Sequence, residues 1–490
     1  MPPRHRLTRA NFIKRASVTT GAAVFATAAL DPIGALSQDP PQCPTPPSGG
    51  THFVPGQDAR AIVLRKPISG LSASELATLQ SAFSALRNLP ESDVRSWKQQ
   101  ADMHALYCDQ CNNDTAQIHF SWTFFPWHRA YLYYFERILG KLAGDLANFR
   151  LPYWDWENDA HLPAPYASPN NSGNFLWDTN RNAGLAGGGV LETIDSDPPL
   201  SSRVPFLYTI YDFTTFGGTA QPVGPTAMGA CESDPHGNVH TATGLPEPVY
   251  RDMGDLGYAA RDPIFFAHHS NIDKIWSRWN KLATSTSGGP SGAYQNPTNS
   301  AFLNERWSFY DENGNTVSIS ASDVLDYKNN LRYAYDPIRL LVLPLWEIYV
   351  CKLLYNPPDP GPMLPITSIE RSGIFEALDR GSPVALVLQG VSLPENASGS
   401  YEIAAVRAKE RIALGTFTIV PGSMKMSGRE ANLAFDITGV VRPLFASGAS
   451  ARLEVFAVRG KEVAGAPAYR LTIRHAEFRT RRVQQSATQS

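Results

Sequence analysis

Seven of the eleven histidines in the sequence fall in four short segments. They are His104, His119 and His128 in the first part of the chain, and His236, His240, His268 and His269 further along. The i, i+4 spacing of His236 and His240 places two imidazoles on one face of a helix, where they can bind one metal ion. Either His268 or His269 can complete that site. Two groups of three histidines, without an accompanying set of carboxylates or thiolates, favour copper or zinc over calcium or magnesium. A pair of such all-histidine sites favours two coppers, with a zinc hydrolase as the alternative.

Helices are expected to position these histidines. Pro126 suits the first turn of a helix, and His128 follows it together with apolar residues at helical spacing. Residues 262–282 predict another helix, which starts with an Asp-Pro pair suited to the N-cap and the first helical position. Further helices are predicted over residues 93–106 and over residues 72–89, the latter from a capping-box pattern. The upstream histidines therefore lie on or beside two predicted helices.

The overall composition excludes several classes of protein. The 490 residues contain 43 Lys+Arg and 45 Asp+Glu, and 43% of them are hydrophobic. A net charge of -2 gives no basic surface for a polyanion, so we expect no nucleic-acid partner. We also expect no membrane partner, because the mature chain has no apolar run long enough to span a bilayer.

Changes in composition divide the chain into successive parts. We expect residues 38–345 to be a mostly α catalytic domain, with a helical bundle core that holds two coppers and with long loops. A hairpin segment at 300–336 would end this domain, because its residues alternate around an Asn-Gly turn. Residues 346–365 are predicted to be a Pro-rich linker. Alternating apolar runs in 366–480 predict an all-β sandwich or barrel, and 481–490 are expected to be a disordered tail.

The N-terminal residues 1–37 have the layout of an export signal. A basic stretch precedes small apolar residues and a plausible cleavage site. Residues 8–14 resemble the twin-arginine export motif, although Ala10 replaces its second arginine. We therefore predict an exported protein, either periplasmic or secreted, and a disordered basic tail is the alternative reading.

The residues around both histidine groups resemble the copper signatures of the tyrosinase and polyphenol oxidase family. Residues 119–136 are similar to the first signature of that family, and residues 262–273 to the second. Residues 307–314 and 331–336 resemble the segment that follows the catalytic domain in plant-type polyphenol oxidases. The resemblance thus extends over nearly the whole mature chain, and it implies a plant-type architecture with a C-terminal shielding domain.

The resemblance implies two copper ions per chain and six ligands. The first copper would be held by His104, His119 and His128, and the second by His236, His240 and His269. His268 is then implied to lie beside the ligands without binding the metal, since neighbouring residues on a helix differ by about 100° in direction. Asp273, one helical turn after His269, could orient an imidazole.

The same resemblance gives the cysteines a structural role. In plant-type members, the residue four after the first ligand forms a thioether to the second ligand, so a crosslink between Cys108 and His119 is implied. We further hypothesise a disulfide between Cys43 and Cys111. A strained local disulfide between Cys108 and Cys111 is the alternative, and it would leave Cys43 unpaired.

The resemblance implies copper-dependent oxidation of o-diphenols to o-quinones with reduction of O2 to water. Glu232 matches a residue that holds a water near the site, and Phe265 matches one that packs near the substrate ring. Gly237 and Thr241 occupy positions that tune monophenol hydroxylation, which we expect to be weak or absent because Gly237 has no hydrogen-bonding side chain. Leu256 stands where a bulkier residue usually guards the entrance, so it should widen that entrance.

Residues 366–480 are expected to act as a lid that keeps the enzyme latent until a protease cleaves the linker; a passive stabilising domain is the alternative. The expected partners are small phenols, O2 and an activating protease. Two other functions use the same residues, namely an o-aminophenol oxidase and an O2-binding protein of haemocyanin type.

Overall fold

A computed structural model describes the chain from residue 47 to residue 482. Within that range it leaves out residues 109–116, 168–173, 192–198, 246–250, 285–290, 337–344, 357, 367–368, 370, 395–397, 409, 423–427, 447 and 460–461. The expected signal at residues 1–37 lies outside the described residues. None of the described helices is long and apolar enough to cross a membrane.

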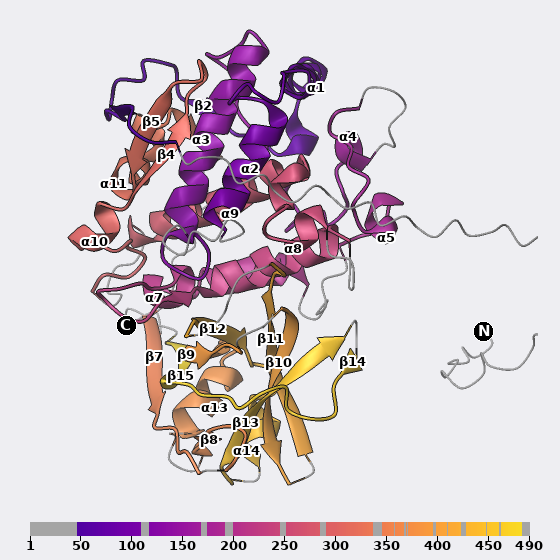
Figure 1. Cartoon of the computed structure of the whole chain (residues 1–490). Helices are drawn as coiled ribbons and strands as arrows, with labels where there is room; N and C mark the ends of the chain where they lie inside the picture. The colour runs from indigo at the N-terminus through magenta and orange to yellow at the C-terminus, as the bar shows by residue number, and fades with distance from the viewer. Residues whose placement is uncertain are drawn as a thin grey trace, which may run out of the picture. The chain divides into compact units, whose positions relative to one another are not determined.

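The first part of the structure is helical (Figure 1). Its longer helices are α1 (Ala73–Arg87), α2 (Trp97–Tyr107), α3 (Phe124–Leu142) and α9 (Ile264–Lys281). Shorter helices join them: α4 (Ala164–Ala167), α5 (Ala183–Ala186), α6 (Leu200–Leu207), α7 (Phe213–Gly217), α8 (Asn238–Thr243), α10 (Ser300–Leu303), α11 (Ala321–Leu325) and α12 (Tyr327–Asn330). Single turns η2 (Ile68–Gly70), η4 (Asp252–Gly254), η5 (Ala259–Arg261) and η6 (Leu282–Thr284) complete this part, with the irregular helical segment η3 (Glu232–Gly237). The expected helical core with long connections is confirmed.

The predicted helix starts are present. The Ser72 hydroxyl accepts the backbone N–H of Glu75, and the Glu75 carboxylate accepts the backbone N–H of Ser72, which completes the capping box of α1. At the start of α9, the Asp262 carboxylate accepts the backbone N–H of Ile264 at 2.9 Å. Local sequence therefore determines where two of the long helices begin.

Small sheets flank the helices. β4 (Arg306–Tyr310) and β5 (Thr316–Ser320) form the expected antiparallel hairpin, and β1 (Thr51–His52) pairs with β5 in parallel. β2 (Val63–Leu64) pairs with β6 (Tyr333–Ala334), which ties the start of the described chain to the end of the helical part.

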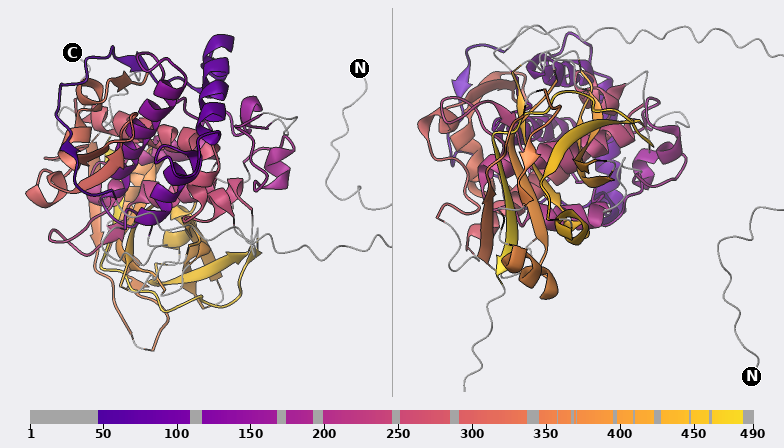
Figure 2. Two further views of the ribbon diagram at one scale, coloured as in Figure 1. Left: turned by 45° about the horizontal axis from the view of Figure 1, so that its top comes forward. Right: turned by 90° about the horizontal axis from the view of Figure 1, so that it is seen from below.

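The C-terminal part consists mainly of two five-stranded sheets. Figures 1 and 2 show its strands as arrows. One sheet has the order β11-β10-β13-β14, with β8 also paired to β13. The other has the order β3-β12-β9-β15-β7. The strands are β3 (Ala227–Met228), β7 (Leu345–Cys351), β8 (Met363–Leu364), β9 (Val384–Ser392), β10 (Gly399–Arg407), β11 (Glu410–Ile419), β12 (Glu430–Asp436), β13 (Ala451–Arg459), β14 (Glu462–Val463) and β15 (His475–Arg482); helices α13 (Arg371–Asp379) and α14 (Val441–Ala446) accompany them. The expected β domain at the C-terminus is confirmed, and two short helices accompany its strands.

Two strands of the second sheet lie outside the boundaries expected from composition. β7 falls mostly in the expected linker 346–365, yet it pairs along its whole length with β15. β15 in turn continues two residues into the expected tail 481–490. The prolines that suggested a linker begin only after β7, at Pro357, so composition placed the boundary too early. β3 is a third unexpected feature, because it belongs to the helical part by sequence and pairs in parallel with β12.

Candidate metal centre

The upstream histidines come together in the helical core. His104 lies on α2, His119 precedes α3, and His128 lies in the second turn of α3. Their ring centroids are 5.2–5.5 Å apart, and each residue is buried. The candidate ligand atoms of these three residues lie within 4.8 Å of one another, close enough to share one metal ion.

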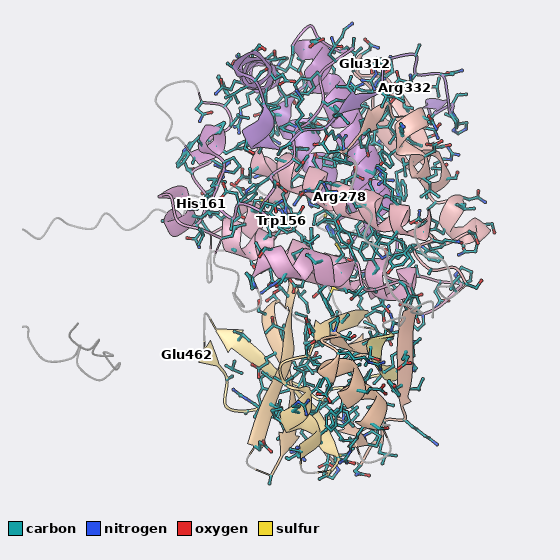
Figure 3. The ribbon with its side chains drawn as sticks, turned by 180° about the vertical axis from the view of Figure 1, so that it is seen from behind. Trp156, His161, Arg278, Glu312, Arg332 and Glu462 are labelled. Carbon is teal, nitrogen blue, oxygen red and sulfur yellow. The ribbon has the colours of Figure 1, made fainter. Side chains whose placement is uncertain are left out.

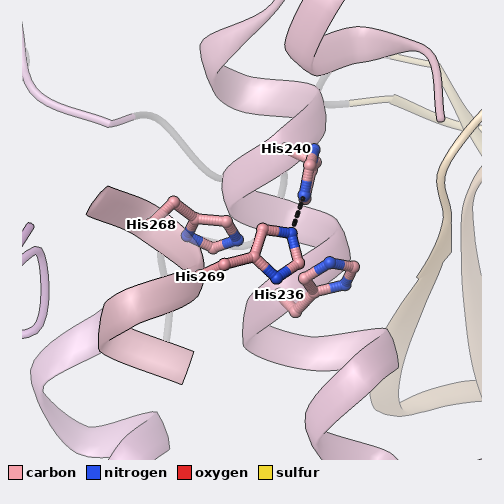
Figure 4. Close-up of side chains that lie close together, drawn as sticks. All are labelled: His236, His240, His268 and His269. Atoms are coloured by element: carbon pink, nitrogen blue, oxygen red, sulfur yellow. Dashed lines mark hydrogen bonds between the residues drawn. The ribbon is translucent and has the colours of Figure 1, made fainter. Parts of the chain in front are cut away.

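The downstream histidines form a second group on η3, α8 and α9 (Figure 4). The candidate ligand atoms of His236, His240, His268 and His269 also lie within 4.8 Å of one another. The two groups adjoin, because the rings of His128 and His269 stack with centroids 4.2 Å apart and an interplanar angle of 4°. The arrangement therefore suits a pair of neighbouring metal ions.

Hydrogen bonds to the backbone orient three of these rings. The Nδ1 atoms of His128, His236 and His240 lie 2.7–2.9 Å from the carbonyl oxygens of Phe124, Glu232 and Met253. A carbonyl can only accept, so each Nδ1 carries the ring proton and each Nε2 has a free lone pair. This is the tautomer in which Nε2 binds a metal.

Several of the Nε2 atoms are buried without a hydrogen-bond partner, as expected for metal ligands in the absence of the metal. Those of His119, His128 and His236 are buried, and they have no hydrogen-bond partner among the described residues. The Nε2 atom of His240 lies 3.2 Å from that of His269. A cation between such lone pairs would satisfy all of them, so the donor set fits copper or zinc.

Burial keeps the imidazoles neutral. Loss of solvation, and then the neighbouring histidines, lower the pKa of His104, His119, His236 and His269 well below the usual range. The pKa of His128 falls to about 3, and that of His240 to about 4. Neutral imidazoles can bind a metal at neutral pH without first losing a proton.

Of the cysteines expected to form crosslinks, the structure describes Cys108 but not Cys43 or Cys111. The Cys108 sulfur lies 3.4 Å from Nδ1 of His119, against the ring to which a thioether was implied. Cys43 and Cys111, the hypothesised disulfide pair, lie outside the described residues. Cys231 and Cys351 are buried free thiols.

Glu232 faces the site from the start of η3. Its Oε1 accepts the backbone N–H of Phe120 at 2.7 Å, and Phe120 adopts a left-handed backbone conformation, with φ of 59°. Such a conformation is unfavourable for a residue with a side chain, and here it directs the amide toward the carboxylate. Burial raises the pKa of Glu232 to about 8, although the Phe120 hydrogen bond acts to lower it.

The other residues expected to tune the reaction have different surroundings. The Phe265 ring packs among the clustered histidines, with its centroid 4.2 Å from that of His269 and 4.8 Å from that of His104. The Thr241 hydroxyl donates back to the carbonyls of Gly237 and Asn238 in its own helical turn. Thr241 therefore presents no free hydroxyl to the metals.

The space beside Leu256, where the resemblance implies the entrance, is filled by the C-terminal part of the chain. Thr418 and Val420, at the end of β11, line a cavity of about 10 Å³ together with His119, His236, Leu256 and other residues. The backbone N–H of Leu256 donates to the carbonyl of Pro421 at 2.8 Å. A cavity of that volume holds about one water molecule, so the wide entrance expected from Leu256 is occupied.

Asp273 does not orient an imidazole as expected. Its carboxylate accepts hydrogen bonds from Arg129, Arg65, Tyr333 and Tyr335 at 2.6–3.3 Å. Burial alone would raise its pKa, but Arg129 and Arg65 hold that pKa below the usual value. The spacing on α9 was compatible with an imidazole partner, but two buried arginines from distant segments take the carboxylate instead.

Sequence analysis missed one residue that touches the site. The indole Nε1 of Trp156 donates to Nδ1 of His268 at 3.1 Å, and both residues are buried. Trp156 lies in the aromatic and acidic stretch 152–157, within the helical part of the structure (Figure 3). That unusual composition could have marked the stretch as functionally important, but it does not show which residue the Trp156 indole contacts.

Comparisons with known proteins agree with this geometry. Residues 94–203 and 192–282 match the common central domain of tyrosinase, and residues 296–344 match the polyphenol oxidase middle domain. The solved polyphenol oxidase of Grenache grape (Vitis vinifera) is 32% identical, with a TM-score of 0.52; the match covers 61% of this chain and 94% of that one. The chain belongs to the tyrosinase and polyphenol oxidase family. The family has a dinuclear copper centre, and the two histidine groups supply the donors for it.

Two further relatives define how far the similarity extends. The structure of latent apple tyrosinase is 24% identical, with a TM-score of 0.62, and the match covers 87% of this chain and all of that one. At that identity it supports the fold alone, including the β domain. The latent chloroplastic polyphenol oxidase of apricot (Prunus armeniaca) is 35% identical over 289 residues, which are 54% of this chain and 47% of the relative. The chain thus spans about half the length of the curated relatives it matches.

The prediction of the protein's subcellular location disagrees with the names of its relatives. The curated polyphenol oxidases of apricot, apple and grape are named as chloroplastic, so the prediction of a periplasmic or secreted protein is wrong. A basic segment rich in small residues and poor in acidic ones is also typical of plastid transit peptides, and composition did not separate the two kinds of signal.

Proposed function

We propose that this chain oxidises o-diphenols to o-quinones with O2 as the oxidant. Two molecules of catechol would give up four electrons and four protons in total, and O2 would take them up to form two water molecules. His104, His119 and His128 would hold one copper, and His236, His240 and His269 the other. The bound copper supplies the redox chemistry that couples phenol oxidation to O2 reduction. The observation that carries the proposal is the convergence of buried, neutral Nε2 atoms from two adjoining groups.

The surrounding residues determine what these histidines can do. Phe265 wedges between ligands of both groups and restricts ring motion. A thioether from Cys108 would restrain the His119 ring in the same way. Glu232, buried and with its Oε2 unpartnered among the described residues, is placed to hold a water or to take a proton from a phenol.

We propose diphenol oxidation as the main activity, with weak or absent monophenol hydroxylation. Gly237 offers no side chain to orient a water, and the Thr241 hydroxyl is engaged by its own helix. An o-aminophenol oxidase or a haemocyanin-like O2-binding protein would use the same donors, and substrate turnover distinguishes these alternatives.

The test is to load the full-length protein with copper, measure metal per chain, and follow O2 uptake with catechol, tyrosine and o-aminophenol. We expect two coppers per chain and uptake with catechol above all, lost in His128→Ala and His269→Ala. Reversible O2 binding without turnover would favour the haemocyanin-like alternative. Binding of zinc in place of copper, with no O2 uptake, would refute the oxidase.

We also propose that the C-terminal domain keeps the enzyme latent. Thr418 and Val420 fill the space beside His119 and His236, and a cavity of about 10 Å³ cannot admit a catechol. A proteolytic cut in the Pro-rich stretch after β7 would open the site only if the β domain then moves away.

The contacts that hold the domain in place are made by residues outside that stretch. The Asp212 carboxylate accepts Nη1 of Arg479 at 2.7 Å, and Thr214 and Thr215 accept hydrogen bonds from Asn432 and Gln389. Pairing of β3 with β12 and of β7 with β15 adds backbone hydrogen bonds on both sides. Limited proteolysis followed by size-exclusion chromatography tests this: we expect the two fragments to co-elute and to remain latent until a mild denaturant separates them. Full activity in the co-eluting complex would contradict the proposed lid.

A further inference from the structure

The hydrogen bond between Trp156 and His268 determines which nitrogen of the histidine carries the proton. An indole N–H can donate but not accept. Nδ1 of His268, 3.1 Å from Nε1 of Trp156, must therefore be an acceptor. A cationic ring would carry a hydrogen on both nitrogens, so its Nδ1–H would point at the indole N–H and no hydrogen bond could form. His268 is consequently neutral, with its single proton on Nε2.

This tautomer is opposite to that of the neighbouring ligands. His236 and His240 carry their proton on Nδ1, where they donate to backbone carbonyls, and their Nε2 lone pairs are free for a metal. His268 has an Nε2–H, so it cannot bind a metal through that atom while Trp156 holds Nδ1. Its N–H is instead a hydrogen-bond donor within the second histidine group.

The Nε2–H group of His268 is buried and donates no hydrogen bond to any residue in the described part of the chain. Its ring centroid lies 4.9 Å from that of His240, 5.1 Å from that of His269 and 5.5 Å from that of His236, and Figure 4 shows the ring facing His269. Nε2 has no hydrogen-bond partner among the described residues. A buried N–H without an acceptor is costly, and an anionic atom bound beside it would satisfy it.

The segment that carries Trp156 is fixed against the same helix. The backbone N–H of Trp154 donates to the carbonyl of Ala267, the residue before His268, at 2.9 Å. Trp156 itself is 1% exposed. Trp156 is therefore a positioning residue that acts through His268, with little freedom to move away.

We propose that Trp156 fixes His268 as an Nε2–H donor to an anionic ligand atom bound in the second histidine group. The ligand class is a small anion or the phenolate oxygen of a substrate. The anion-binding part rests on the proposed copper site, whereas the tautomer does not depend on it.

The first test reads the tautomer directly. Long-range ¹H–¹⁵N NMR of the full-length protein, labelled in histidine and loaded with copper(I) without O2, identifies which nitrogen of His268 is protonated. We expect protonated Nε2 in the wild type and a shift toward protonated Nδ1 in Trp156→Phe. Protonated Nδ1 in the wild type would overturn the proposal. If the chain binds no copper, the metal-free protein gives the same readout, so failure of the copper site is distinguishable.

The second test measures the affinity of the copper-loaded protein for an anion. Azide is titrated into the oxidised copper-loaded full-length protein, and its dissociation constant is compared across variants. We expect affinity to fall about two- to tenfold in Trp156→Phe, which loosens the donor, and about ten- to hundredfold in His268→Leu, which removes it. Trp154→Phe is the matched control, because its indole N–H donates to the carbonyl of His161 instead, and its affinity should equal that of the wild type. No azide binding by the wild type, or equal affinities in all variants, would refute the donor role.

Discussion

The hydroxyl of Thr418 offers the sharpest test of latency. It donates to the side-chain oxygen of Asn238, between the proposed ligands His236 and His240, and also lies 2.8 Å from the Ser400 hydroxyl. Thr418 and Asn238 are 2% and 1% exposed, respectively. Thr418→Val keeps the side-chain shape but leaves the Asn238 oxygen buried without this donor whenever the β domain is docked.

The expected size of the effect follows from the cost of a buried unsatisfied group. That cost is about 1–3 kcal/mol, and it applies only to the docked state, because water satisfies Asn238 when the domain is away. The equilibrium should thus shift toward the open state by about 5- to 150-fold. Catechol oxidation by the uncleaved protein should rise by the same factor until the site is mostly open.

The assay compares O2 uptake by uncleaved protein with uptake after cleavage and separation of the domain. Thr418→Val should raise the first rate and leave the second unchanged. Thr480→Val is the matched control: Thr480 is buried in β15, and its hydroxyl has no hydrogen-bond partner among the described residues, so its loss should leave latency intact. An uncleaved rate within twofold of the wild type would show that this contact does not hold the domain closed.

Three further predictions concern the lid, the core and the metal. Gly237→Ala should also raise the latent rate, because the new Cβ would lie 3.1 Å from the carbonyl oxygen of Thr418; an unchanged rate would mean that the lid adjusts freely. Asp273→Asn should lower the urea midpoint of unfolding by an amount equivalent to about 3–5 kcal/mol, since it leaves Arg129 and Arg65 buried without that charge, whereas Asp379→Asn in an exposed ion pair should change it little. Equal effects would refute the structural role given to Asp273. Copper should raise the melting temperature, because each site filled at a thousandfold excess over its dissociation constant stabilises the folded chain by about 4 kcal/mol. Chelation should reverse that gain in the wild type and in His161→Ala, an exposed histidine, whereas His128→Ala should show a smaller gain, because only the second histidine group remains complete.

The sequence predicted best what is encoded locally. The capping box at Ser72 and the Asp-Pro pair at residue 262 determine helix starts through neighbouring atoms, and both are present. The histidine groups were predictable because their spacing fits helices and their motifs are long. Asp273 was misassigned because spacing along α9 gives its direction but not the arginines that reach it from other segments.

Contacts across the fold explain the remaining differences. Trp156 meets His268 across 112 positions in sequence, and Thr418 meets Asn238 across 180, so no local pattern could pair them. The boundary at β7 was missed because its strand pairing with β15 depends on a segment more than a hundred residues away. Composition reveals the prolines that follow β7, but it cannot show that β7 pairs with β15.

The short strand β3 has a consequence for the opened protein. Because it pairs with Glu430 and Ala431 at the outer edge of β12, this edge of the sheet ends on a short strand supplied by the helical part. Departure of the β domain would expose the backbone N–H and C=O groups of these two residues, and an unpaired sheet edge is a template for pairing with another chain. The released domain should therefore self-associate, and light scattering would detect this as the concentration rises. Activation would then be hard to reverse, because the edge needed for re-docking would be consumed by aggregation.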